Sequence, residues 1–298
     1  MDGLALGKFS KYLAKKSDIR RASVPRKMFS NKYQNGRLLI IGGSSDYYGA
    51  PVMAMNSACQ SLAALRVGAG YVKAFVPESI LNTARALSPN AIISPSGKNE
   101  IAFGDAIKKA IDKSDVVLIG IGMGSRHANA IRKIVEYSVF NDKLVILDAD
   151  AIPAARLVTG LGASQMLITP HDGEFSRLTN KKIPARSISE RIEAAKAASN
   201  KYKTVVLLKG HNTIVTDGTL VKIIQARSAA LATMGTGDVL SGIIGGYASR
   251  CKDLFAAAVA GAYVHSKIGD LLHKKKGDHI LATDIIDMLP DVLKDLDR

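Results

Sequence analysis

Aromatic residues, cysteines and long apolar runs are all scarce in this chain, and each scarcity argues against a class of protein. Aromatic residues make up 5% of the 298 residues and tryptophan is absent, so few side chains could stack on the bases of a nucleic acid. The two cysteines, Cys59 and Cys251, lack the paired spacing of a metal or redox site. No apolar run reaches the roughly 18 residues of a membrane span, and no signal-like apolar segment opens the chain. We therefore expect a cytoplasmic protein.

Positive charge, in contrast, is abundant. The formal net charge is +15 and the isoelectric point about 9.7, which suits nucleic acid, an acidic lipid surface or an anionic small substrate, and charge alone does not choose among them. Eight basic residues crowd the first stretch: Lys8, Lys11, Lys15, Lys16, Arg20, Arg21, Arg26 and Lys27. Because no aromatic residues are interleaved as in a nucleic-acid-binding signature, we interpret residues 1–36 as a basic helical lead-in with a solvated or phosphate-attracting face. We expect neither nucleic acid nor membrane as a partner.

Short β-branched segments alternate with alanine-rich segments of helical length, which predicts an α/β fold with a mostly parallel sheet. The predicted strands are residues 37–41, 71–76, 115–119, 144–147, 166–168 and 205–208, and the predicted helices include 52–66, 126–139 and 188–200. Residues 273–279 are expected to form an exposed loop before a helix starting near Thr283. No repeat or linker divides the chain, so we expect a single domain over residues 1–298.

Glycine-rich or polar residues follow most of the predicted strands. Examples are Gly42-Gly43, Gly120 to Gly124, Asp148-Ala149-Asp150, Thr169-Pro170-His171 and Lys209-Gly210-His211. In open α/β sheets, ligands bind beyond the carboxyl ends of the strands. The functional site is therefore expected along this edge of the sheet.

The strongest chemical motif is Gly235-Thr236-Gly237-Asp238, which precedes an apolar helix. Glycine backbone allows N–H groups to close around a phosphate, and the positive end of the helix points at the same place. Asp238, in the first turn, is expected to stay ionised there and to accept a hydroxyl proton during phosphoryl transfer. The structural alternative is a helix cap. We favour catalysis because the motif contains two flanking glycines and the helix continues with the small residues Gly242, Gly245 and Gly246.

His171 and Glu174 lie three residues apart, which places them on one face of a helix start. Zinc is not expected, since no third ligand is spaced to join them. Glu174 is interpreted as facing Mg²⁺ and phosphate, or alternatively as serving the helix dipole. For Asp148 and Asp150 we leave open whether they order Mg²⁺-bound water or hold a loop. No role is assigned to His127, His265, His273 or His279.

Taken in order, these motifs resemble the ADP/ATP-dependent NAD(P)H-hydrate dehydratases, which are ribokinase-like repair enzymes. The resemblance runs from about Val24 to the C-terminus. The matching pieces are Val24-Pro25-Arg26, Gly36-Arg37 through Gly42-Gly43-Ser44, Tyr48-Gly49-Ala50-Pro51, Gly120 to Gly124, Leu147-Asp148-Ala149-Asp150-Ala151, Thr169-Pro170-His171 with Gly173-Glu174, Lys209-Gly210 with Thr213, and Gly235 to Asp238.

The resemblance implies a three-layer ribokinase-like fold and a defined reaction. A nucleotide, ADP or ATP, phosphorylates the hydroxyl of the hydrated nicotinamide ring with the help of Mg²⁺, and elimination of phosphate restores NADH or NADPH. Asp238 matches the catalytic base. Ala50, Gly124 and His171 match positions that, together with Asp238, line the site of the hydrated dinucleotide. The positions that match the nucleotide site are Lys209, Gly210, His211, Asn212, Thr213, Gly235, Thr236 and Gly237. Relatives are often homo-oligomeric, and we expect the same here.

Three positions depart from the family pattern. Met234 stands where glycine is usual, and Ile121 and Asp172 stand where proline is common. Met234 is expected to affect the approach of the nucleotide. The epimerase domain that is fused to this domain in many bacteria has no match, so we expect the dehydratase step alone.

Two other functions remain as alternatives. Ribokinase-like kinases for hydroxymethylpyrimidine, pyridoxal or hydroxyethylthiazole share the Gly-rich loop, but many have asparagine at the position of His171. A non-catalytic nucleic-acid-binding protein is the alternative suggested by the charge, and it would bind with a steep dependence on salt.

Overall fold

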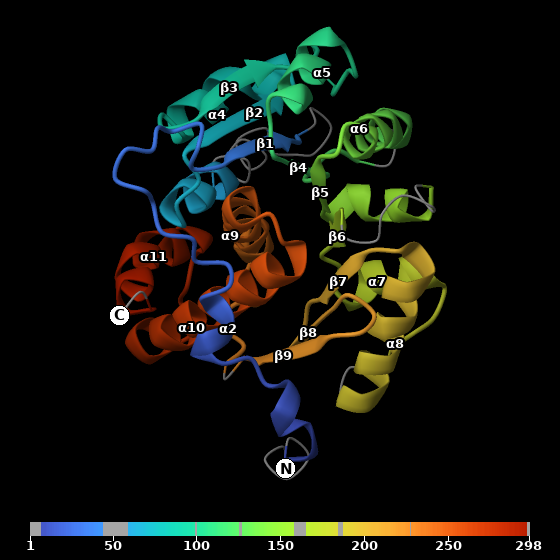
Figure 1. Ribbon diagram of the computed structural model, residues 1–298, viewed down its shortest axis with the longest axis vertical. Coiled ribbons are helices and arrows are strands. Elements are labelled where there is room, and N and C mark those ends of the chain that lie inside the picture. The colour runs from blue at the N-terminus through green and yellow to red at the C-terminus, as the bar shows by residue number, and fades with distance from the viewer. Residues whose placement is uncertain are drawn as a thin grey trace.

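The structure, a computed structural model, describes residues 7–43, 59–98, 100–124, 127–157, 165–183, 187–226 and 228–296. Within these ranges, nine strands form one twisted sheet (Figure 1). The strands are β1 (Arg37–Ile41), β2 (Tyr71–Val76), β3 (Ile92–Pro95), β4 (Val116–Ile119), β5 (Leu144–Leu147), β6 (Met166–Ile168), β7 (Val205–Leu208), β8 (Asn212–Thr216) and β9 (Val221–Gln225). The six predicted strands are all present, and β3, β8 and β9 were not predicted.

The strand order is β3-β2-β1-β4-β5-β6-β7-β8-β9. Pairing is parallel from β3 through β7 and antiparallel between β7, β8 and β9. The chain builds outward from β1 through β2 to β3 and then returns to β4 on the other side of β1. The carboxyl ends of β1 and β4 therefore flank a topological switch point, the usual position of a ligand crevice in such sheets.

Helices cover both faces of the sheet and give the three layers expected. The helices are η1 (Gly7–Tyr12), α2 (Lys16–Ile19), η2 (Glu78–Ile80), α4 (Leu81–Leu87), α5 (Asp105–Asp112), α6 (Ala128–Phe140), η4 (Ala149–Arg156), α7 (Asp172–Thr179), α8 (Ile188–Tyr202), α9 (Thr236–Cys251), α10 (Leu254–Lys276) and α11 (Ala282–Leu296), with residues 59–66 helical as well. Of these, η1, η2 and η4 are 3-10 helices. Among the described residues, no helix is both long and apolar enough to cross a membrane.

Two hydrophobic cores lie on opposite faces of the sheet, and neighbouring residues of one strand alternate between them. In β1, Leu38 and Ile40 pack with α9, α10 and α11, whereas Leu39 and Ile41 pack with α5, α6 and α8. This is the two-residue period of a strand that is buried on both faces. Because both cores share one sheet, we propose that the chain forms a single domain.

Two segments differ from expectation. The expected loop at 273–279 is wrong for its first half, because α10 continues to Lys276 and ends where Gly277 takes a positive φ of 62°. The last turn of the helix contains His273 and the cationic residues Lys274 to Lys276, and the helix dipole favours positive charge there. The lead-in is less helical than expected: its described residues 7–36 contain only two short helices, η1 and α2. They are joined by residues 13–15, where Leu13 forms an isolated bridge with Ile223 of β9, and turns follow α2.

Candidate active site

The predicted Gly-rich motif forms the start of α9, and several hydrogen bonds hold it in place. Gly235 is the N-cap with φ 85°, a conformation that favours glycine. The Thr236 hydroxyl donates to the carbonyl oxygens of Leu231 (2.7 Å) and Thr233 (2.8 Å). The first N–H groups of a helix have no partner within it, so this braced turn presents donors to an anion.

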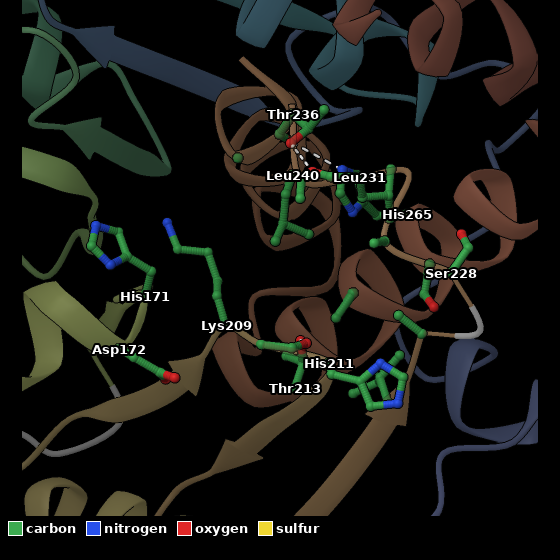
Figure 2. A pocket seen from close by; sticks show the side chains of 18 residues that line it. His171, Asp172, Lys209, His211, Thr213, Ser228, Leu231, Thr236, Leu240 and His265 are labelled. Carbon is green, nitrogen blue, oxygen red and sulfur yellow. Dashed lines mark hydrogen bonds between the residues drawn. The ribbon is translucent and has the colours of Figure 1, made fainter. Parts of the chain in front are cut away.

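A cavity of about 830 Å³ opens beside this turn (Figure 2). It lies between the β7 end with the β8–β9 ribbon on one side and α9 with α10 on the other. Its walls include six of the predicted nucleotide-site residues: Lys209, Gly210, His211, Thr213, Thr236 and Gly237. The rest of the wall is largely apolar, with Ile224, Leu231, Leu240 and Ala262. A polar end next to an apolar slot suits a ligand with phosphates and a planar base.

Gly237 has no side-chain constraint from the protein itself. A Cβ placed on Gly237 would meet only the Lys209 Nζ, at 3.7 Å, which is an ordinary contact distance. The fold therefore accepts a side chain at this position, and that side chain would extend into the cavity. The packing of the fold does not require glycine at position 237. The absence of a side chain there does, however, leave room for a ligand.

The Met234 side chain, in contrast, is 76% exposed and is not among the residues that line the cavity. The expected effect of Met234 on the approach of the nucleotide is therefore not seen in the shape of this cavity.

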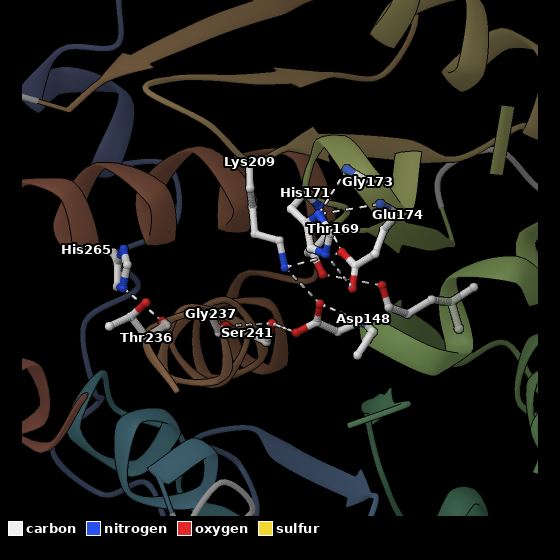
Figure 3. Close-up of polar contacts among 12 residues, drawn as sticks. Asp148, Thr169, His171, Gly173, Glu174, Lys209, Thr236, Gly237, Ser241 and His265 are labelled. Carbon is white, nitrogen blue, oxygen red and sulfur yellow. Dashed lines mark hydrogen bonds and ion pairs between the residues drawn. The ribbon is translucent and has the colours of Figure 1, made fainter. Parts of the chain in front are cut away.

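Lys209 and Asp148 form the centre of a polar network next to the cavity (Figure 3). The Lys209 Nζ lies 3.2 Å from Asp148 Oδ1 and 3.9 Å from Glu174 Oε2. The Asp148 carboxylate also accepts hydrogen bonds from the Ala149 N–H, at 2.9 Å, and from the Ser241 hydroxyl on α9. Burial alone would lower the pKa of Lys209, but Asp148 and Glu174 more than offset it, so the pKa is raised and the ammonium stays charged. Asp148 thus holds Lys209 and Ser241 in place, and its other expected role, ordering Mg²⁺-bound water, stays a prediction.

Asp238 is the third residue of α9 and borders this network. Burial, followed by the negative charge of Asp148, raises the pKa of Asp238 to about 7, although Lys209 opposes the shift. The expectation that the helix dipole keeps Asp238 ionised is therefore wrong in one respect, because burial keeps part of the group protonated near neutral pH. Near pH 7 the carboxyl group is divided between its two protonation states, which is the range in which a general base is most effective.

His171 and Glu174 form a capping box at the start of α7. The His171 Nδ1 accepts hydrogen bonds from the N–H groups of Gly173 (3.0 Å) and Glu174 (3.4 Å), and Glu174 Oε2 accepts from the His171 N–H (2.8 Å). The two side chains thus lie together at the helix start, as predicted. Glu174 also has a structural role there, because it caps the helix. The His171 ring lines the cavity and is 55% exposed. It is therefore free to contact a ligand.

Of the residues expected to line the hydrated dinucleotide, the structure describes Gly124 and His171 but not Ala50. Gly124 lies in the turn after β4, where its N–H donates to Asp150 Oδ2 at 2.8 Å, so Asp150 holds this loop. Gly124 takes a positive φ of 74° and is not among the residues lining the cavity. Ala50 lies outside the described residues. Asn212 and Gly235, two of the predicted nucleotide-site residues, are also absent from the cavity wall.

Arg191, on α8, was not identified from the sequence, yet it fixes two parts of the site. Its guanidinium is 2% exposed and donates to Asp172 Oδ1 at 2.6 Å and to the Lys209 carbonyl at 2.8 Å. It therefore ties the beginning of α7 to the end of β7. The departure from the family pattern at Asp172 supplies the carboxylate for this buried arginine.

His265, on α10, also lacks a sequence signal and lines the cavity. Its Nε2 lies 2.9 Å from the Thr236 carbonyl oxygen, so Nε2 carries the hydrogen, because a carbonyl only accepts. Burial lowers the pKa of His265 to about 4, which keeps the ring neutral and leaves Nδ1 as an acceptor. Nδ1 has no hydrogen-bond partner among the described residues. It does not belong to the fully buried polar atoms without a partner, so it is accessible, and it faces the cavity that His265 lines.

Within the described ranges, no three His, Cys, Asp or Glu side chains are grouped closely enough to hold a metal ion on their own. The carboxylates of Asp148 and Glu174 nevertheless lie 3.2 and 3.9 Å from the Lys209 Nζ, and their negative charges add to burial in raising the pKa of Asp238. Mg²⁺ is commonly bound by one or two carboxylates together with the phosphates of a substrate. The residues present fit a cation that arrives with a nucleotide.

Comparison with known proteins gives a consistent result. The family model described as NAD(P)H-hydrate dehydratase matches residues 38–291. The chain is 32% identical over 277 residues to an ADP-dependent (S)-NAD(P)H-hydrate dehydratase of Nitrosopumilus maritimus, covering 92% of this chain and 93% of the relative. It is 33% identical to a bifunctional NAD(P)H-hydrate repair enzyme of Pyrobaculum aerophilum, covering 93% of this chain and 54% of that enzyme.

Among solved structures, the chain is similar to an ADP/ATP-dependent NAD(P)H-hydrate dehydratase from Bacillus subtilis that was co-crystallized with ATP and Mg²⁺. The TM-score is 0.75 and the sequence identity 27%, over 95% of this chain and 98% of the other. The likeness to a hydroxyethylthiazole kinase from Pyrococcus horikoshii, with a TM-score of 0.57 and 14% identity, concerns the fold alone.

Proposed function

The chain belongs to the NAD(P)H-hydrate dehydratase family, and from this premise we propose that it dehydrates the hydrated nicotinamide ring of NADH or NADPH at the expense of a nucleotide. The observation that carries the proposal is the position of Asp238: a carboxyl group with a pKa of about 7 at the start of α9, next to Gly237 in the cavity wall. A base beside an anion site is the arrangement that phosphoryl transfer requires, so this position supports the proposal.

The nucleotide is assigned to the 830 Å³ cavity, with its phosphates toward the first turn of α9 and Lys209. The raised pKa of Lys209 supports this assignment, because the ammonium remains charged and offsets phosphate charge. The hydrated dinucleotide is assigned to the strand ends near the switch point, with Ala50, Gly124 and His171 along it. Its ring hydroxyl then faces Asp238.

The reaction proceeds in two steps. Asp238 accepts the proton of the ring hydroxyl while that oxygen attacks the terminal phosphorus of the nucleotide, which leaves shortened by one phosphate. The C–O bond of the phosphorylated ring then breaks, inorganic phosphate departs, and loss of a proton from the adjacent ring carbon restores the double bond. Hydroxide is a poor leaving group near neutral pH and phosphate a good one, so phosphorylation makes the dehydration feasible.

Mg²⁺, when bound with the nucleotide, would neutralise charge on the phosphates, and Glu174 is the residue we assign to its surroundings. Glu174 is already engaged by the His171 N–H and lies near Lys209, so its contribution is indirect.

The direct test is to incubate hydrated NADH with Mg²⁺ and either ADP or ATP. We expect the absorbance of the reduced nicotinamide to return and inorganic phosphate to appear one for one with it. ADP is named as the nucleotide of the Nitrosopumilus relative, and we expect turnover with ADP here. If neither nucleotide releases phosphate with the hydrate, while a vitamin-precursor alcohol is converted to a stable phosphate ester, the chain is a kinase and the proposal fails.

The His265 acceptor yields a prediction about the nucleoside. An exocyclic amine donates to Nδ1, whereas the carbonyl of inosine diphosphate repels it, so the parent should bind ADP more tightly than inosine diphosphate. We expect His265→Phe to reduce this preference by about tenfold, the effect of one hydrogen bond of roughly 1.4 kcal/mol. Calorimetry with both nucleotides measures the ratio of affinities, which a general disturbance of the site would not change.

The matched control is His279→Phe, because His279 is exposed and does not line the cavity. If His265 instead accepts from the sugar, the loss appears with 2′-deoxy-ADP and inosine diphosphate binds like ADP. Equal affinities for all three nucleotides in the parent contradict the assignment of His265 to nucleoside recognition.

A further inference from the structure

A second cavity, of about 910 Å³, lies at the opposite end of α9 from Asp238. Its walls come from residues 19–26, the turn at 66–68, the last turns of α9 and the end of α11. Since α9 rises 1.5 Å per residue, Arg250 lies about 21 Å along the helix from Thr236. This cavity is therefore separate from the proposed active site.

The second cavity is strongly basic. Five of its lining residues are cationic, and none of those described is acidic: the cations are Arg20, Arg26, Arg66, Arg250 and Lys294. Part of the basic lead-in, to which the proposed reaction gives no role, is thus gathered into a concave surface rather than spread over a solvated face.

Two of these arginines build the wall. The Arg26 guanidinium donates to the Gly68 carbonyl at 3.2 Å, and the Arg250 guanidinium donates to the Val24 carbonyl. Gly68 has φ 109°, and a Cβ there would lie 2.5 Å from Arg250 Nη1, so the turn makes room for the guanidinium. The positions of both charges are consequently held by the backbone.

The other three cations, Arg20, Arg66 and Lys294, have no hydrogen bond or ion pair with any described residue. Their neighbours differ: Arg21 pairs with Asp253 at 2.7 Å, and Lys16 donates to the Asp295 carbonyl at 3.1 Å. Among the described residues, these two contacts are thus made outside the cavity, while Arg20, Arg66 and Lys294 line it without a partner. Like charges in one cavity repel one another, and an anion bound among them would remove that cost.

We propose that this cavity is a second ligand site, for a phosphate-rich small anion such as pyrophosphate or a nucleoside polyphosphate. Guanidinium groups bind phosphate oxygens through paired hydrogen bonds. The cavity is similar in volume to the one assigned to the nucleotide, about 910 against 830 Å³. A hollow of this size, open to solvent on one side, suits a small polyanion better than an extended strand of nucleic acid, which needs a continuous groove and stacking side chains.

The test uses pyrophosphate in calorimetry, with the full chain carrying Gly237→Val so that the start of α9 contributes little. The cavity variant combines Arg20→Gln, Arg66→Gln and Lys294→Gln, which leaves the wall-forming Arg26 and Arg250 in place. The control variant combines Lys133→Gln, Lys182→Gln and Lys275→Gln, three exposed residues outside the cavity. Both variants lose three positive charges, so they differ only in where the charge is removed.

We expect the cavity variant to bind pyrophosphate at least tenfold more weakly and the control variant within twofold of its parent. Pyrophosphate should also raise the melting temperature of the parent and the control, but not of the cavity variant. Equal losses in both variants, or no loss in either, overturn the proposal. Affinity that grows with the length of a single-stranded oligonucleotide and disappears in the cavity variant assigns the site to nucleic acid instead. Turnover of hydrated NADH, measured in the same variants without Gly237→Val, reports separately on the proposed function.

Discussion

Replacing Asp238 with asparagine is expected to lower the turnover of hydrated NADH by two or more orders of magnitude, while ADP still binds. Asparagine keeps the shape of the side chain but cannot accept the hydroxyl proton, and the loss of a positioned base typically has an effect of this size. Steady-state kinetics and calorimetry with ADP measure the two quantities. Asp105→Asn is a suitable control, because Asp105 is also in the first turn of a helix and is exposed. Activity of Asp238→Asn within a few-fold of the parent would falsify the role of Asp238.

The raised pKa adds a signature in pH. Only the deprotonated carboxylate of Asp238 acts as a base, so kcat/KM of the parent should fall as the pH drops below about 7. Stability should change in the opposite sense: the folded state holds the proton more tightly than the unfolded state, so this group contributes stability below pH 4 that is lost as the pH rises through about 7. Asp238→Asn should therefore raise the melting temperature at pH 8 and leave it nearly unchanged at pH 4. A parent profile that is flat between pH 5 and 8 contradicts this assignment.

The Gly237→Val variant is expected to fold normally and to lose measurable binding of both ADP and ATP. A Cβ at Gly237 meets no protein atom closer than the Lys209 Nζ, at 3.7 Å, so the fold has room for the side chain. The branched carbons would then occupy the place where we assign phosphate, and the ligand could not approach the backbone. Calorimetry gives the affinity, and thermal unfolding shows that the fold is retained.

Gly104→Val is the matched control for this variant. Gly104 is the N-cap of α5, and a Cβ there has no heavy atom within 4 Å, so the same side chain is added at another helix start. Nucleotide affinity of this control should equal that of the parent. If Gly237→Val also binds ADP and ATP like the parent, then Gly237 is simply part of the entry to a helix.

The parallel strands were predictable because each is a short apolar run followed by glycine or polar residues. β1, β2, β5, β6 and β7 have the predicted bounds, and the prediction for β4 was one residue too long. β8 and β9 were missed because they form an antiparallel ribbon whose first strand begins with Asn212 and Thr213, residues that also suit a loop. β3 lies at the edge of the sheet and is partly exposed, so its apolar pattern is weak.

The site was predictable where it is local in sequence. Gly235 to Asp238 and the His171–Glu174 pair are contiguous motifs, whereas Arg191 and His265 lie on helices whose contacts with the site become visible only in three dimensions. The ionisation of Asp238 was misjudged for the same reason, since the burial of its carboxyl group and the nearby charge of Asp148, the two largest causes of its raised pKa, depend on distant segments of the chain. Gly242 and Gly246, taken as support for the phosphate motif, serve close packing: a Cβ on either would approach the backbone of Gln60 or Ala64 to under 3 Å.

The position of α9 in the chain has a consequence for biosynthesis. The helix that carries Asp238 also packs against β1, β4 and β5, the central strands, yet it follows all nine strands in sequence. A ribosome that adds roughly 5–20 residues per second leaves one apolar face of the nascent sheet uncovered for several seconds, until α9, α10 and α11 emerge. The nascent chain should therefore depend on chaperones until its last quarter is synthesised. The same last quarter, which covers the exposed face of the sheet, also supplies Asp238, so the chain cannot be active before that face is covered. A chain that terminates prematurely before Thr236 would lack both, and the cell would meet it as an aggregation-prone fragment rather than as a slow enzyme.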